Sequence, residues 1–214
     1  MDFTKGTTNS GGYYVLVNAA NKSVTIDLGG CTVSVYGDAA HLSSISAADN
    51  MLLAVFCTDL GGNLTIKDTG GSGSVYVYAN GANIYSVAST YGSGSALSIE
   101  SGYYYLDQTS ANAMFYAQKN TDFQVSGGSF YLGNTNSPYA PWIFNASGNY
   151  WDGGGLQITV TGGTYNADPT HSRGDVTLTN DTGYQAVRNA DGTFSVFLVT
   201  FSDGTVREGN PAGI

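Results

Sequence analysis

The apolar and polar positions of this chain alternate in short stretches that are separated by glycine. Residues 125–132 read VSGGSFYL, in which Phe130 and Leu132 alternate with Ser129 and Tyr131 after a pair of glycines. Successive side chains of a β-strand point to opposite faces, so this alternation predicts a strand with one buried face. Glycine at a bend allows backbone conformations that a side chain would penalise. The stretch therefore predicts a strand, a tight bend and a second strand.

The same phrase recurs at unequal intervals along the chain. It reads IESGYYYL at 99–106 and VTGGTY at 160–165, and an isoleucine or valine anchor precedes each bend: Ile26, Ile66, Ile99, Val125 and Val160. A further apolar stretch precedes each anchor, at 13–17, 52–57, 83–88, 113–118 and 141–146. Three short strands per turn with one variable loop are typical of a β-helix, in which equivalent residues stack. We predict an all-β fold, a single-stranded right-handed parallel β-helix of about five coils, with Ile66, Ile99, Val125 and Val160 in one interior column.

The end of the chain has a different pattern. VRNADGTFSVF (187–197) and VTFSDGTVRE (199–208) each place Asp-Gly between alternating stretches, which is a hairpin signal. We predict that residues 1–183 form the parallel β-helix and that 184–214 form a C-terminal antiparallel cap or exit segment, which protects the last strand edge. An antiparallel β-sandwich is the alternative fold, but such hairpin signals are scarce before residue 190.

Composition excludes several classes of function. Charged residues make up 11% of the chain and the net charge is −9, with seven Lys and Arg scattered singly. A nucleic-acid binder needs a basic surface, so we expect no nucleic-acid partner. No apolar stretch approaches the roughly 18 residues of a spanning helix, so we expect no membrane insertion. The opening MDFTKGTTNSGG lacks the features of a signal peptide. Either the protein is not secreted by that route or the sequence is a trimmed domain with an added Met, and we favour the second interpretation.

Two stretches resemble known β-helix proteins. SVTIDLGGCTVSV (23–35) resembles the opening coil of pectate-lyase-like β-helix proteins. VTGGTYNADPT (160–170) with GYQAVRNADGTFSV (183–196) resembles the last coil and exit strands of repeat domains in large surface proteins of gut clostridia and their relatives. The resemblance covers most of residues 13–197. It implies a right-handed β-helix at an extracellular or cell-surface location, with a carbohydrate-related role, and it implies no particular activity.

The sequence lacks the catalytic motifs of the polysaccharide-cleaving enzymes that share this scaffold. The hydrolases of this fold have an Asp pair, a His-Gly and an Arg-Ile-Lys phrase, and this sequence has none of them. The lyases need a base that abstracts a proton, and the candidates here are Arg173 and Arg188, which lie in the expected exit segment and cap. His41 and His171 lie in expected loops. We therefore predict no catalytic residue, no cofactor and no metal site, and we favour a non-catalytic domain while enzymatic activity stays open.

Carboxylates and cysteines have simpler interpretations. A glycosidase needs two facing carboxylates, and the candidates are Asp27, Asp68, Asp107, Asp122 and Asp152. We interpret them as turn-capping residues, as in DTGG (68–71) and NTD (120–122). Cys31 and Cys57 are expected to be small buried apolar side chains, with a disulfide as the alternative in an exported protein.

Aromatic residues are the strongest candidates for binding. Tyr103, Tyr105 and Tyr131, like Tyr76 and Tyr78, fall on the outward side of expected strands, whereas Trp142 is expected to fill the core. Exposed aromatic rings beside polar groups stack on sugars and are common in protein interfaces. The predicted ligand-binding residues for carbohydrate or protein are Tyr150, Trp151, Asp152, Tyr139, Tyr103, Tyr105 and Tyr131.

The leading hypothesis is a non-catalytic extracellular β-helix domain of a bacterial surface protein. It would act as an adhesin or a structural stalk, as a monomer, with a glycan or a host or cell-surface protein as partner. One alternative is a divergent polysaccharide lyase or hydrolase, although a net charge of −9 suits an anionic substrate poorly. The other is a phage tail or capsid-fibre module, which would assemble as a trimer.

Overall fold

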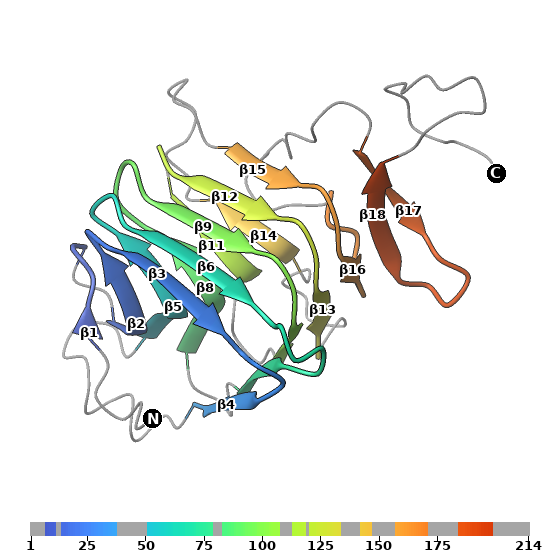
Figure 1. Cartoon of the computed structure of the whole chain (residues 1–214), viewed down its shortest axis with the longest axis horizontal. Helices are drawn as coiled ribbons and strands as arrows, with labels where there is room; N and C mark the ends of the chain where they lie inside the picture. Colours follow the sequence, from blue (N-terminus) through green and yellow to red (C-terminus); the bar gives the residue numbers. More distant parts are fainter. Residues whose placement is uncertain are drawn as a thin grey trace.

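The strands of this chain stack in layers along one axis. The computed structural model describes residues 7–11, 14–37, 51–78, 83–107, 113–118, 120–133, 142–146, 157–170 and 184–198. Within these ranges every regular element is a strand, which confirms the all-β prediction. Figure 1 shows the strands of successive coils lying side by side, with the N-terminal coil at one end and the hairpin of β17 and β18 at the other.

Three parallel sheets contain five strands each. The first sheet contains β2 (Tyr14–Ala20), β5 (Met51–Asp59), β8 (Asn83–Thr90), β11 (Ala113–Ala117) and β14 (Trp142–Ala146). The second contains β3 (Ser23–Asp27), β6 (Asn63–Lys67), β9 (Ala96–Ile99), β12 (Asp122–Val125) and β15 (Gln157–Val160). The third contains β4 (Thr32–Tyr36), β7 (Ser74–Tyr78), β10 (Tyr103–Asp107), β13 (Ser129–Leu132) and β16 (Thr164–Tyr165). Because the chain visits the sheets in turn, it forms a parallel β-helix of about five coils, as predicted.

The predicted interior column lies in the second sheet. Ile66 is in register with Ile99, Ile99 with Val125, and Val125 with Val160. All four side chains are 0% exposed, so the column is confirmed. Ile26 continues it in the first coil, where it is half-buried because no described strand of the second sheet lies beyond β3.

A second interior stack is aromatic. The rings of Tyr104, Phe130 and Tyr165 follow one another in register along the third sheet, with centroids 5.3 and 4.8 Å apart. The hydroxyl of Tyr104 donates to the Ser101 carbonyl, and that of Tyr165 donates to the Gly162 carbonyl, each at 2.8 Å. Burial raises the pKa of both phenols, so they remain neutral donors.

Antiparallel strands lie at both ends of the coils. β17 (Tyr184–Arg188) and β18 (Phe194–Leu198) form a hairpin around Asp191 and Gly192, and β18 pairs with β16. This confirms the predicted hairpin over 187–197, whereas residues 199–208 lie outside the described ranges. At the opposite end β1 (Thr7–Thr8) pairs antiparallel with β2, a pairing that the sequence did not predict. No helix that could cross a bilayer occurs among the described residues.

Two side chains differ from their predicted burial. Cys31 is exposed in the bend before β4, so the prediction that both cysteines are buried was wrong for it. Cys57 is buried and free, and burial raises its pKa to about 11. Trp142 is half-buried, and the core positions beside it are filled by Ile143 and Phe144 instead. It opens β14, the last strand of the first sheet, so no described strand covers its far side.

Candidate binding site: the tyrosine surface

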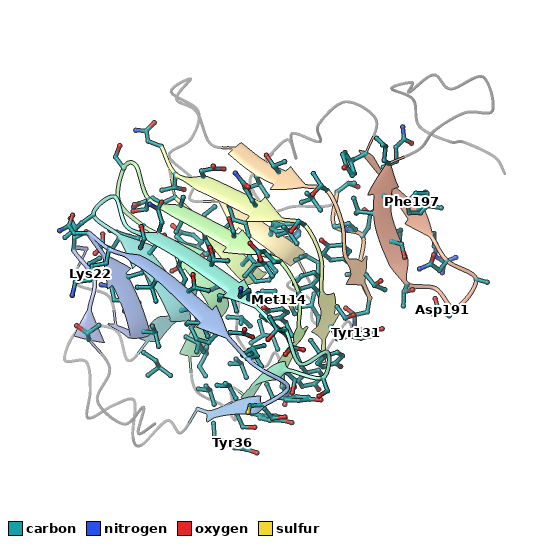
Figure 2. The ribbon with its side chains drawn as sticks, viewed as in Figure 1. Lys22, Tyr36, Met114, Tyr131, Asp191 and Phe197 are labelled. Carbon is teal, nitrogen blue, oxygen red and sulfur yellow. The ribbon has the colours of Figure 1, made fainter. Side chains whose placement is uncertain are left out.

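Six tyrosines share the outward face of the third sheet. Inward positions of its strands hold Val75, Val77, Leu106 and Leu132, so strand alternation turns the residues between them outward. We call these six residues the tyrosine surface: Tyr36 from β4, Tyr76 and Tyr78 from β7, Tyr103 and Tyr105 from β10, and Tyr131 from β13. Figure 2 labels Tyr36 and Tyr131, which belong to the first and fourth coils.

The six rings form one continuous chain of contacts. Tyr36 stacks on Tyr78 with centroids 5.0 Å apart and planes 9° apart, and Tyr103 stacks on Tyr131 at 5.3 Å and 21°. Tyr76 connects the two stacks, because its centroid lies 6.1 Å from that of Tyr78 and 5.5 Å from that of Tyr103. Such pairs contribute about 0.5–1.5 kcal/mol each beyond the area they bury. The inner rings therefore cover part of one another's faces and present their remaining faces, edges and hydroxyls.

The surface is neutral and exposed unevenly. Tyr36 is 72% exposed, whereas the other five rings are half-buried. Burial raises the pKa of Tyr78, Tyr103 and Tyr105. The charge of Asp107 raises the pKa of Tyr105 and Tyr78 further, and neighbouring phenols act in the same direction on all three. These hydroxyls therefore keep their protons at neutral pH and can both donate and accept hydrogen bonds. Asp107 is the charged residue in register with Tyr78 at the margin of the surface.

The sequence predicted half of this surface as a binding site. Three of the predicted binding residues, Tyr103, Tyr105 and Tyr131, lie together with Tyr76 and Tyr78 in the structure. Tyr36 was not predicted; the alternation of TVSVY in β4 was the available signal. The other predicted binding residues, namely Tyr139, Tyr150, Trp151 and Asp152, lie outside the described residues, and their role stays a prediction.

The carboxylates of the first two coils cap bends. Asp27 Oδ1 accepts hydrogen bonds from the N–H groups of Gly29 and Thr69, both at 3.0 Å, and its Oδ2 accepts from the Thr69 hydroxyl at 2.8 Å. Asp68 accepts from the N–H groups of Gly30, Gly70 and Gly73 at 2.6–3.1 Å. This confirms the turn-capping interpretation for both residues. Among the described residues no group of three or more His, Cys, Asp and Glu side chains is arranged to hold a metal ion.

Acid is expected to loosen this bend. Hydrogen bonds from Thr69 hold the pKa of Asp27 below its ordinary 3.8. Burial alone raises the pKa of Asp68, but three glycine N–H groups outweigh it and lower the pKa. Because the folded-state values are lower, both carboxylates stabilise the fold above pH 3.8, and this contribution is lost as the pH falls through the folded-state values. Urea unfolding from about pH 5 to 2 should show a shallower decline in stability for Asp27→Asn/Asp68→Asn than for wild type; equal slopes would contradict this account.

Comparison with known proteins gives no match. No family model matches the chain, and no curated protein and no solved structure matches it at a significant level. The strand register alone establishes the architecture, a parallel β-helix with strands stacked in every third position.

Proposed function

We propose that this chain is a non-catalytic extracellular domain of a bacterial surface protein, and that its tyrosine surface binds a glycan. One observation carries the proposal: six tyrosines from four consecutive coils make a single uncharged surface of contacting rings. The resemblance to pectate-lyase-like proteins and to surface-protein repeats of gut clostridia supports the extracellular location.

The second sheet provides an internal comparison. It belongs to the same coils as the third sheet, yet its outward row holds Thr25, Thr65, Ser98, Gln124 and Thr159. Polar side chains at outward positions are therefore sufficient for strand formation and solubility on this scaffold. Since tyrosine takes the equivalent row of the third sheet in three coils, a requirement other than strand formation accounts for it.

The chemistry of the surface suits a neutral sugar polymer. Phenol hydroxyls donate and accept hydrogen bonds as sugar hydroxyls do, and ring faces and edges provide the apolar contact. A net charge of −9 opposes acidic polymers. Two of the five candidate carboxylates for a glycosidase, Asp27 and Asp68, are engaged by backbone N–H groups, which supports a non-catalytic role for these two residues.

A glycan array tests the proposal with a matched pair of variants. Wild type is expected to bind neutral glycans, and Tyr76→Ala/Tyr103→Ala to lose at least about tenfold in affinity, because it removes the link between the two stacks. The control is Tyr85→Ala/Tyr116→Ala. It removes another pair of contacting rings, with centroids 5.2 Å apart and planes at 89°, but this pair lies on the first sheet. It should bind as wild type does once circular dichroism shows that both variants are folded.

Other outcomes would redirect the assignment. Loss of binding in Tyr150→Ala/Trp151→Ala, with the tyrosine surface intact, would move the site to the 148–155 segment. Silence on the array with capture of a host surface protein would make the domain a protein-binding adhesin. Release of unsaturated uronic acids from a pectic polymer would show a lyase, and a trimer in solution would favour a phage fibre module.

A further inference from the structure

One row of the tyrosine surface is incomplete. Ser34, Tyr76, Tyr105 and Tyr131 are in register on β4, β7, β10 and β13, one residue for each of the first four coils. Coils two to four place a ring in this row, whereas the first coil places the small side chain of Ser34, which is exposed. The row therefore has a position for a fourth ring that the described side chains leave unfilled.

The neighbours of this position are aromatic on two sides. Tyr76 contacts the rings of Tyr78, Tyr103 and Tyr105, which lie in its own strand and the next one, and no ring from β4 contacts it. Tyr36 follows Ser34 by two residues on the same face and stacks on Tyr78, at 72% exposure. Tyr76 thus forms the back of the position and Tyr36 one side.

The backbone of β4 adds polar groups at the same place. Among the described residues, β4 is the last strand of the third sheet. The Cys31 carbonyl accepts from Ser74 N–H and the Gly37 N–H donates to the Tyr78 carbonyl, so residues at odd positions bond to β7. Because alternate residues of a strand direct their backbone groups to opposite edges, the N–H and C=O groups of Thr32, Ser34 and Tyr36 point away from β7. We call this edge, with which no described strand pairs, the open edge of β4. Its N–H and C=O groups suit a ligand that has hydroxyls.

We propose that one neutral pyranose ring of the glycan occupies this position, stacked on Tyr76 beside Tyr36 and above the Ser34 hydroxyl. A pyranose is close in size to a phenol ring, and its C–H groups match the negative face of an aromatic ring. Its hydroxyls are matched by the Ser34 hydroxyl and by the open edge of β4. The outward residues of β4 carry no charge, which selects a neutral sugar over an acidic one. This inference rests on the proposed function and specifies where the sugar sits.

The decisive variant is Ser34→Tyr, because it fills the position with the ring that the row lacks. Soluble glucan, mannan and galactan are the probes, measured by calorimetry. Affinity for the polymers that wild type binds is expected to fall at least about tenfold in Ser34→Tyr. The melting temperature should stay the same or rise, since the new ring can stack on Tyr76. Thr25→Tyr places the same side chain on the second sheet of the same coil and should bind as wild type does.

Two further measurements keep the test decisive. Tyr36→Ala removes an exposed side chain at little cost to folding, and it should weaken binding severalfold even if Ser34→Tyr is unstable. Affinity should be unaffected by added sodium chloride, because a neutral ligand leaves no charge pair to screen.

The possible failures are distinguishable. Unchanged affinity in both Ser34→Tyr and Tyr36→Ala, with loss in Tyr76→Ala/Tyr103→Ala, would overturn this position and leave the proposed function standing. Strong salt dependence would overturn the neutral ligand. Absence of binding of wild type to all the polymers would overturn the proposed function itself.

Discussion

Phe115→Ala is expected to lower the free energy of unfolding by about 3–5 kcal/mol, as large buried aromatic truncations do. Phe115 is 1% exposed, and its ring contacts those of Phe123, Phe130 and Phe144 with centroids 5.3, 5.4 and 5.6 Å away. These partners come from all three sheets, so the cavity would lie where the sheets meet. The surrounding backbone is fixed by strand pairing and can collapse into the space only in part. Urea denaturation followed by circular dichroism measures the loss.

Phe197→Ala is the matched control for this prediction. It removes the same atoms from β18, where the side chain is 46% exposed. The free energy of unfolding should fall by less than about 1 kcal/mol, because little apolar surface returns to water. If the two variants lost similar amounts of stability, the aromatic centre would not be the principal core of the coils.

Gly62→Ala is expected to have a comparable or larger effect. Gly62 lies in the bend between β5 and β6, where its N–H donates to the Asp59 carbonyl at 2.9 Å and its carbonyl accepts from the Ala96 N–H at 2.9 Å. A Cβ at this position would overlap the carbonyl oxygen of Ala19, in the preceding coil. The obstacle is backbone that is itself held in the first sheet, so relief requires the coils to separate locally. Overpacking costs about 1–3 kcal/mol where side chains can move, and more is expected here.

Gly61→Ala separates this crowding from backbone strain. Gly61 precedes Gly62, has φ +76°, and a Cβ built on it would meet nothing within 4 Å. Its substitution should therefore cost about 1 kcal/mol, from the left-handed conformation alone. Thermal and urea unfolding of the two variants provide the comparison, and equal losses at positions 61 and 62 would contradict the role of close approach between coils.

The architecture was predictable because it depends on local alternation. Val125, Phe130 and Leu132 alternate with outward residues within one short stretch, and this pattern repeats in each coil. Strand periodicity and stacking of repeats then leave few folds to choose from. The hairpin around Asp191 was predictable for a similar reason, since its carboxylate accepts from the N–H and hydroxyl of Thr193, two residues away.

The complete tyrosine surface was not predictable from the sequence. Tyr36 and Tyr78 come into contact because β4 and β7 pair with Thr32 opposite Ser74, and the sequence between them does not specify that register. The exposure of side chains in the first and last coils was not predictable either. Whether Cys31 and Trp142 are buried depends on which neighbouring strand covers them, and the sequence does not specify this. The pairing of β1 was missed because two threonines have no alternation.

The bends between the second and third sheets in the last three coils restrict how this protein can diversify. The chain passes from Val125 to Ser129, and from Val160 to Thr164, by short turns in which Gly127 and Gly162 lie against the backbone of the previous coil. An inserted residue there would move every later coil out of register. The passage from the third sheet back to the first has no common length, since it joins Tyr36 to Met51 in one coil and Tyr78 to Asn83 in the next. The passage from the first sheet to the second also varies, since it joins Ala20 to Ser23 in one coil and Ala146 to Gln157 in another. Insertions and deletions in descendants of this sequence can therefore accumulate at these two passages, so that the loops vary while the ring-bearing face is inherited intact.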